Sequence, residues 1–276
     1  ADIAINPSNE NNWYVAVGSG GTWKTENAGT TWIPLTDDES FYSTGCITID
    51  PNNHDKIWLG TGENVGGRHV GIGHGIFVSH DSGDTWTDMG LNESEHISKI
   101  IVHPDNSNII WVASQGPLWN SGGDRGLFKS IDGGRTWSNK LYVNEWTGVT
   151  DLLIDPKNPD ILYAATWQRH RNVAALIDGG PGTSIYKSLD GGDNWEKIDS
   201  GLPSSNMGKI GLAISPMKPN VIYAAIELDR RNGAVYRSEN SGGTWIKMSN
   251  TVSGGTGPHY YQELVASPFV FDKICR

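Results

Sequence analysis

Residues 130–137 read Ser-Ile-Asp-Gly-Gly-Arg-Thr-Trp, and variants of this octapeptide recur along the chain. Each variant starts with Ser or Thr, has Asp or Asn two residues later, has Gly two residues after that and ends on Trp. The other four are TENAGTTW (25–32), SHDSGDTW (79–86), SLDGGDNW (188–195) and SENSGGTW (238–245). The Asp or Asn positions are 27, 81, 132, 190 and 240, so the spacing is 50 to 58 residues. A fixed period of this length indicates a tandem structural repeat.

A second pattern alternates with the octapeptide. It consists of a short hydrophobic run, a polar turn with proline and a second hydrophobic run, as in ITIDPNNHDKIWLGTG (47–62). The further copies are at 3–18, 100–116, 152–166 and 212–226. Short apolar runs bounded by Pro, Asn and Asp are typical of β-hairpins. Each period therefore holds four strands: two around the proline turn, a third that ends at the Ser or Thr of the octapeptide and a fourth that begins at its Trp.

Four-stranded units in tandem predict an all-β fold, a β-propeller of four-stranded blades. No segment has the 3.6-residue periodicity of a helical repeat, and a flat β-solenoid is the remaining alternative. Five full repeats are expected, at about 1–43, 44–96, 97–149, 150–206 and 207–259, with a partial sixth at 260–276. The chain is either one propeller domain or, as the partial repeat favours, a fragment of a larger propeller.

The octapeptide has a structural explanation. The Asp or Asn oxygen can accept backbone N–H groups downstream, Gly permits a positive φ, and Trp covers the edge of the blade. A calcium loop needs more oxygen ligands than these turns offer. We therefore assign structural roles, with no metal or cofactor, to the ten positions Asn27, Trp32, Asp81, Trp86, Asp132, Trp137, Asp190, Trp195, Asn240 and Trp245.

Composition limits the partners. The net charge is -10 and the pI is near 5.2, which argues against a nucleic-acid ligand. No apolar run approaches the roughly 20 residues of a membrane helix, so no membrane insertion is expected. Cys46 and Cys275 lie far apart in the sequence and are expected to be buried free thiols, with a disulfide or a metal site as the alternatives.

Function is expected on the loops between the second and third strands and on the connections between blades, where the repeats diverge. These loops are rich in Arg, His and Trp, which suit carboxylate binding and stacking on sugar rings or peptide side chains. The ligand-binding candidates are Glu63, Arg68, His69, Trp119, Arg125, Trp146, Arg169, His170 and Arg171. Alternatively, the charges pair with Glu63, Asp124, Asp178 and Asp229 to stiffen the loops.

The two repeated patterns resemble those of the Asp-box (BNR) repeat propellers. Within that group the sequence is similar to the sortilin-type N-terminal domain and to the xyloglucanase-type glycosidases. The resemblance implies the fold and leaves the activity open, because the box recurs in proteins of unrelated function. The Arg-Ile-Pro motif of sialidases is absent. Xyloglucanase-type enzymes have a catalytic Asp in a TDVGGAYR-like stretch, and the corresponding Val17–Lys24 has no acid.

The missing acid favours a non-catalytic binding propeller that recognises a peptide, protein or carbohydrate through its loop-rich face. The first alternative is a glycoside hydrolase of the xyloglucanase-like type, whose carboxyl pair could come from Glu63, Glu93, Glu95, Asp124 or Glu145. The second is an assembly or scaffold subunit, partnered by a larger complex or by the remainder of its own propeller. The resemblance implies an extracellular, periplasmic or cell-surface location.

Overall fold

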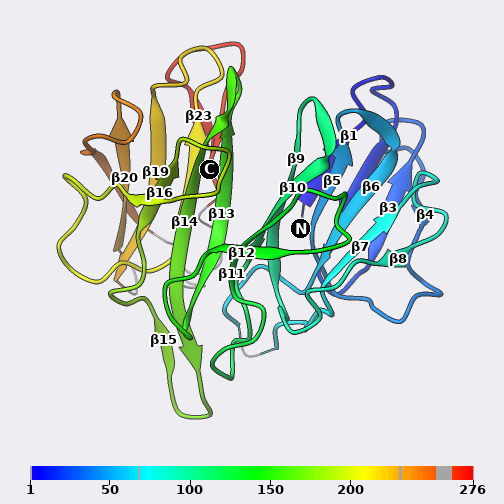
Figure 1. Ribbon diagram of the computed structural model, residues 1–276, viewed down its shortest axis with the longest axis horizontal. Helices are drawn as coiled ribbons and strands as arrows, with labels where there is room; N and C mark the ends of the chain where they lie inside the picture. Colours follow the sequence, from blue (N-terminus) through cyan, green and yellow to red (C-terminus); the bar gives the residue numbers. More distant parts are fainter. Residues whose placement is uncertain (1, 68, 230–231, 253–262, 276) are drawn as a thin grey trace. The chain divides into compact units, whose positions relative to one another are not determined.

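All regular elements among the described residues are β-strands, as the sequence predicts (Figure 1). The computed structural model describes residues 2–67, 69–229, 232–252 and 263–275. The chain forms two compact units. The first contains residues 1–117 and 122–139, and the second contains residues 118–121 and 140–276.

Three four-stranded antiparallel sheets follow one another from the N-terminus, in the orders β1-β2-β3-β4, β5-β6-β7-β8 and β12-β11-β10-β9. Their strands are β1 (Asp2–Ile5), β2 (Trp13–Ala16), β3 (Thr22–Thr25), β4 (Ile33–Pro34), β5 (Thr44–Asp50), β6 (Asn53–Thr61), β7 (Ile76–Ser79), β8 (Thr87–Asp88), β9 (Ile97–His103), β10 (Asn106–Ser114), β11 (Gly126–Ser130) and β12 (Ser138–Leu141).

Two further sheets and a hairpin complete the chain. The sheets have the orders β13-β14-β16-β17 and β18-β19-β20-β21, and β22 pairs with β23. Their strands are β13 (Thr147–Asp155), β14 (Asn158–Arg171), β15 (Leu176–Asp178), β16 (Ile185–Ser188), β17 (Glu196–Lys197), β18 (Ile210–Ile214), β19 (Ile222–Asp229), β20 (Asn232–Ser238), β21 (Ile246–Val252), β22 (Val265–Ala266) and β23 (Ile274–Cys275).

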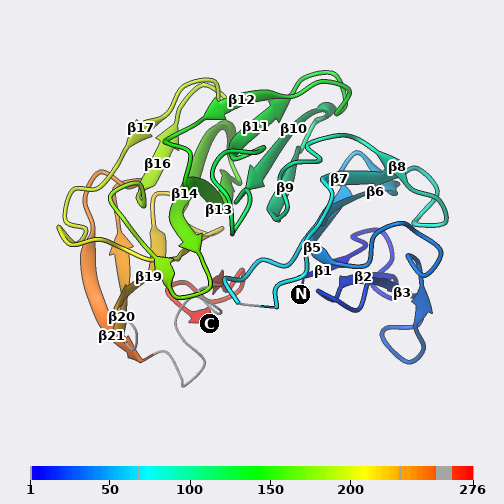
Figure 2. The ribbon, with the colours of Figure 1, turned by 90° about the horizontal axis from the view of Figure 1, so that it is seen from below.

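Each sheet is an up-and-down meander, and the first strands of successive sheets contact one another. In the first unit β1 contacts β5 and β5 contacts β9 (Figure 2). In the second unit β13 contacts β18. Sheets joined through their first strands are the blades of a β-propeller, so the predicted fold is confirmed. One blade carries an addition to its four strands, because β15 pairs with the end of β14 outside the β13-β14-β16-β17 path.

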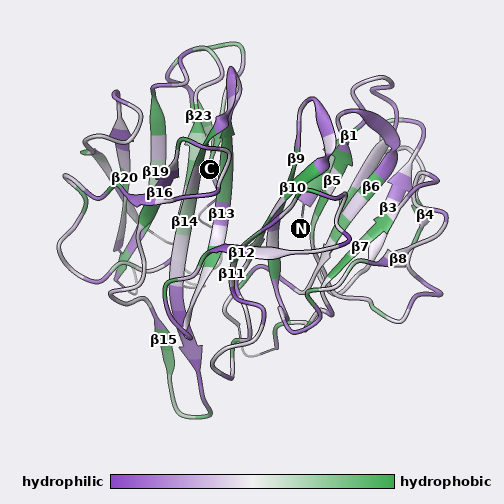
Figure 3. Cartoon of the chain, in the orientation of Figure 1, coloured by the Kyte–Doolittle hydropathy of each residue, from purple (hydrophilic) through white to green (hydrophobic). Residues whose placement is uncertain are grey.

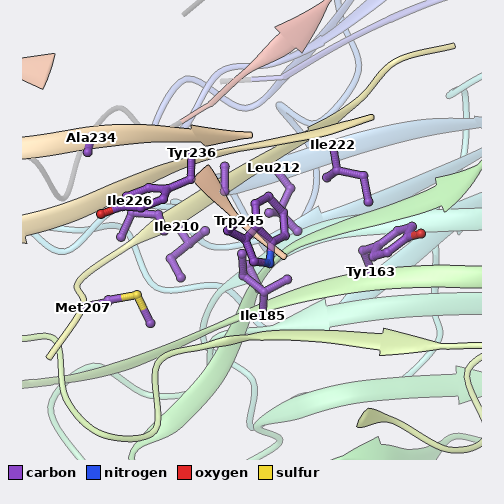
Figure 4. Packing of buried hydrophobic residues seen from close by; sticks show 12 residues of the cluster. Tyr163, Ile185, Met207, Ile210, Leu212, Ile222, Ile226, Ala234, Tyr236 and Trp245 are labelled. Carbon is purple, nitrogen blue, oxygen red and sulfur yellow. The ribbon is translucent and has the colours of Figure 1, made fainter. Parts of the chain in front are cut away.

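The hydrophobic core lies between neighbouring sheets. Figure 4 shows the cluster between the last two sheets, where Trp245 packs among residues such as Tyr163, Ile185 and Leu212. A similar cluster in the first unit surrounds Trp58. Burial of each such side chain contributes about 1.5–3 kcal/mol. Cys46 is buried in this second cluster and Cys275 is exposed; both are free thiols, so the expectation of two buried thiols holds only for Cys46.

The octapeptide turns follow the third strand of each blade. In residues 130–137, Asp132 Oδ1 accepts hydrogen bonds from Ser130 Oγ at 2.8 Å and Thr136 N at 2.9 Å. The Gly134 amide donates to Ser130 Oγ at 2.8 Å. Gly134 has φ +88°, and a Cβ there would lie 2.6 Å from the ring of Trp58, so both backbone and packing require glycine. Equivalent bonds to the Asp or Asn oxygen are present in the turns at Asn27, Asp81, Asp190 and Asn240.

Candidate functional site

One hairpin extends beyond its blade in the second unit. The pairing of β14 with β16 covers Leu162 to Ala165, whereas β14 itself continues to Arg171 and pairs there with β15. We call residues 169–178 the β14–β15 arm. Figure 1 shows it at the lower end of β14, and Figure 3 shows that this end of β14 is hydrophilic. The arm carries three of the predicted ligand-binding residues, Arg169, His170 and Arg171.

A pair of carboxyl groups lies at the base of the arm. Asp178 stands opposite Arg169 in the β14–β15 pairing, and its side chain shares a hydrogen bond with Glu227 at the end of β19. Glu227 is only 5% exposed, and its Oε2 accepts a hydrogen bond from the Lys209 amide at 3.2 Å. Burial, followed by the nearby charge of Asp178, raises the pKa of Glu227 to about 9. The pair therefore holds one proton at neutral pH.

Two cationic residues adjoin this pair, and both lie against the ring of Trp167. Arg169 is fully buried, and its guanidinium carbon lies 5.0 Å from the centroid of the Trp167 ring. Lys209 is 3% exposed, and its Nζ lies 5.6 Å from the same ring. Burial lowers the pKa of the Lys209 ammonium group. Glycosidases need their two carboxyl groups about 5–9.5 Å apart, on either side of the sugar. Asp178 and Glu227 are in hydrogen-bond contact, so no sugar ring fits between them.

A partly buried aromatic pair lies on the other side of the same strand. The Trp146 and His170 rings have centroids 4.1 Å apart at an interplanar angle of 38°. The Arg169 amide donates to the Trp146 carbonyl at 3.1 Å, which fixes the connection before β13 against the arm. The structure thus brings together Trp146, Arg169 and His170, three of the residues predicted as a site.

A different carboxylate occupies the loops of the first unit. Glu63 follows β6, and its Oε1 accepts hydrogen bonds from Ser19 N at 3.1 Å and Ser19 Oγ at 2.9 Å. Its Oε2 accepts from Gly71 N at 3.0 Å. A Cβ on Gly18 would lie 2.7 Å from Glu63 Oε1, so glycine there allows the close approach. Glu63 therefore brings an acid to the 17–24 turn, which has none of its own.

The loop that carries Glu95 adjoins this site. The Glu95 carbonyl accepts a hydrogen bond from Gly73 N at 2.8 Å, and a Cβ on Gly62 would lie 1.8 Å from the same oxygen. Glu95 has φ +54°, a conformation that costs energy in a non-glycine residue and occurs often at functional sites. Its side chain is 22% exposed, with Oε2 3.9 Å from His96 Nε2.

Arg125 is not placed to reach a ligand. It is fully buried, and Nη1 donates to the Gln115 carbonyl at 2.7 Å while Nη2 donates to the Pro117 carbonyl. Its Nε donates to the Gly122 carbonyl at 3.3 Å. These bonds, made to backbone carbonyls, tie the Arg125 side chain to the loop between β10 and β11.

The remaining candidates differ in exposure. His69 is exposed in the first unit, and Trp119 is 39% exposed in the second. Arg171 is 8% exposed, and its amide donates to the Leu118 carbonyl at 2.9 Å. Arg68 lies outside the described residues.

The candidate residues predicted from the sequence did not include Glu227 or Lys209. A signal for Glu227 was present. When the second strands of the repeats are aligned, Glu227 occupies the position of Gly62, Gln115 and Trp167. An acid at this position, directly after the buried run of the strand, therefore occurs only in the fifth repeat. Lys209 gave no signal, because it stands alone before β18 and becomes part of the cluster only in three dimensions.

The order of the sheets and the contacts between their first strands define a β-propeller. No family model matches the chain. It is 29% identical over 213 residues to a probable oligoxyloglucan-reducing end-specific xyloglucanase of Neosartorya fischeri, which covers 71% of this chain and 23% of the relative. It is 25% identical over 287 residues to a xyloglucanase of a Paenibacillus species, covering 94% of this chain and 27% of the relative.

The solved structures show the same fold. One GH74 enzyme, described as ancestral, superposes with a TM-score of 0.73 at 22% identity over 97% of this chain and 33% of its own. The chain spans about a quarter of the length of these curated relatives. The described residues contain no helix of the length and apolar character needed to cross a membrane.

The expectation of a non-catalytic binding propeller is overturned by this similarity, which favours the glycoside hydrolase alternative. The expectation relied on the absence of an acid in the 17–24 turn. In the folded chain the neighbouring blade supplies an acid there, because the Glu63 carboxylate is hydrogen-bonded to Ser19 within that turn.

Proposed function

We propose that this chain is a propeller segment of a glycoside hydrolase that acts on a xyloglucan-type β-glucan. The observation that carries the proposal is the 29% identity over 213 residues to a protein named as a probable xyloglucanase. Glycan recognition suits the loops, because Trp146 and Trp119 offer partly exposed rings on which sugar faces can stack.

Within this proposal Glu63 is the candidate catalytic carboxylate. Its hydrogen-bond partners are two backbone amides and one hydroxyl, and an ionised carboxylate satisfies all of them. That form can act as the base that activates water or as the nucleophile. Glu95, on the adjoining loop, is the candidate for the second carboxyl group that glycosidases require. Asp178 and Glu227, which touch each other, are assigned no part in bond cleavage.

Polymeric xyloglucan cannot cross a membrane, so an enzyme acting on the polymer must meet it outside the cytoplasm. We therefore place the protein in the extracellular space, in the periplasm or at the cell surface. The relatives' names support a carbohydrate ligand.

The test is a paired assay of hydrolysis and binding with a purified protein that carries the chain. Xyloglucan, xyloglucan oligosaccharides and an unsubstituted β-glucan are the probes. The proposal predicts new reducing ends from the xyloglucan probes, at a rate well above that from the unsubstituted glucan. Tight binding of xyloglucan without any new reducing ends would overturn it.

A further inference from the structure

The base of the β14–β15 arm is attached to the neighbouring blade by backbone hydrogen bonds. Gly180 N, just beyond the arm, donates to the Met207 carbonyl at 3.2 Å. The same segment is tied to β19, because Gly208 N donates to the Glu227 carbonyl at 2.9 Å and Glu227 N donates to the Lys209 carbonyl at 3.0 Å. These bonds place the Glu227 side chain beside the arm.

The packing leaves the Glu227 carboxyl little freedom. A Cβ on Gly208 would lie 2.6 Å from both Cδ and Oε2 of Glu227, and 2.8 Å from the Asp178 carbonyl. Glycine therefore allows the three segments to meet. With Oε2 accepting from Lys209 N, the Glu227 carboxyl contacts Asp178 of the arm through its side-chain hydrogen bond.

We infer that a single proton shared by Asp178 and Glu227 holds the β14–β15 arm against β19, and that loss of this proton releases the arm. Two carboxylates in hydrogen-bond contact cannot both be ionised without strong repulsion. The arm ends at Asp178, so repulsion there acts on β15 and on its pairing with Arg169, His170 and Arg171.

The charged groups around the pair do not remove the need for a proton between the two carboxyl groups. Arg169 and Arg171 on β14 and Lys209 before β18 are buried cations; Asp151 on β13 and Glu263 act on Lys209 from other segments. Lys209 offers its backbone amide to Glu227, while its Nζ lies 4.0 Å from Glu263 Oε1. Burial and the charge of Asp178 outweigh the charge of Lys209, so the pKa of Glu227 is raised to about 9.

Release of the arm also affects the contact between the rings of Trp146 and His170. His170 stands in the arm opposite Ile177, and its ring packs on Trp146, so movement of the arm separates the aromatic pair. The inference does not depend on hydrolase activity, because it concerns the position of the arm alone. Its readout is likewise independent of any substrate.

Amide hydrogen exchange of peptides covering residues 169–180 tests the inference, at about pH 6 and about pH 10, either side of the Glu227 pKa. The wild type is compared with Glu227→Gln, whose amide imitates the protonated acid. Comparison at equal pH cancels the intrinsic pH dependence of exchange. We expect equal protection at the lower pH and about tenfold faster exchange of the wild type than of E227Q at the higher pH. Equal exchange of the two proteins at both values would overturn the inference.

Two further variants complete the experiment. Asp178→Asn removes the other negative charge and is expected to behave as E227Q does. Glu145→Gln changes an exposed carboxylate near Trp146 and is expected to match the wild type at both pH values. Arm protection that falls at the higher pH in E227Q and D178N as it does in the wild type would show that the shared proton does not hold the arm.

Discussion

The indole nitrogen Nε1 of Trp137 lies 2.7 Å from the carbonyl oxygen of Met89 and donates a hydrogen bond to it. Met89 follows the outer strand of the preceding blade, so the tryptophan that ends one octapeptide turn binds its neighbour. The same contact recurs from Trp86 to the Leu35 carbonyl at 3.2 Å and from Trp245 to the Ile198 carbonyl at 3.0 Å. The turn therefore stabilises contacts between blades as well as its own hairpin.

Replacing Trp137 by Phe should reduce the free energy of unfolding by about 1–3 kcal/mol, because the Met89 carbonyl loses its partner. Urea denaturation of the purified protein measures the change. Trp195→Phe is the matched control, since Trp195 Nε1 donates to Gly192 in its own turn at 3.0 Å. Each variant leaves one carbonyl without its partner, so a clear loss in W195F with no loss in W137F would show that the bond between blades does not stabilise the protein.

Acid should weaken the turns that contain aspartate. Hydrogen bonds from the side chain and amide of Thr136 and from Ser130 lower the pKa of Asp132 to about 2, below its ordinary value of 3.8. The stabilisation is complete above about pH 4 and is lost as pH falls through 2. Asp81 behaves alike.

Asp132→Asn should retain the turn at neutral pH, because Asn27 and Asn240 accept the same backbone hydrogen bond in two natural turns. Its melting temperature should fall less steeply than that of the wild type between about pH 4 and pH 2. Asp132→Ala, which removes the acceptor, should melt lower at every pH. Parallel melting curves for the wild type and D132N across this range would contradict the assignment.

Arg125→Lys distinguishes a loop role from a ligand role. Lysine cannot reproduce the guanidinium fork that reaches the Gln115, Pro117 and Gly122 carbonyls. The bonds to Gln115 and Pro117 are buried, and each carbonyl left without a partner there costs about 1–3 kcal/mol. We expect a lower melting temperature, with unchanged xyloglucan affinity in the fraction that stays folded. A large loss of affinity at an unchanged melting temperature would instead make Arg125 a ligand-binding residue.

Glu95→Gln should lower turnover of xyloglucan by about 10²–10⁴-fold while changing KM little, if Glu95 supplies the second carboxyl group. Glu93→Gln, two residues earlier on the same loop, is the comparison variant. Its side chain is exposed, so its rate should stay close to that of the wild type. Turnover of E95Q equal to that of E93Q would remove Glu95 from the reaction.

The repeated patterns were sufficient for the fold, because turn chemistry and strand alternation are local. The third strands end at the predicted positions Thr25, Ser79, Ser130, Ser188 and Ser238. Each fourth strand begins one residue after its Trp instead of at it. The arm was missed, since Gln168–Arg171 is polar and gave no sign of continuing β14.

The loop sites could be predicted only in part. Residue type suggested Arg125 and Arg169 as exposed binding groups, but backbone carbonyls and an aromatic ring hold them in the interior. The contact between Asp178 and Glu227 joins two segments far apart in the sequence, and burial together with the charge of Asp178 raises the pKa of Glu227. Such contacts depend on how adjacent blades pack, which a single repeat does not encode.

The most direct test of the proposed function is the initial rate at which new reducing ends form from xyloglucan, measured for the wild type and for Glu63→Gln at matched melting temperatures. If Glu63 is the catalytic carboxylate, the wild type hydrolyses xyloglucan and E63Q does so at a rate about 10²–10⁴-fold lower. Equal rates in the two proteins would contradict the role of Glu63, and binding of xyloglucan without hydrolysis by the wild type would contradict the glycoside hydrolase itself.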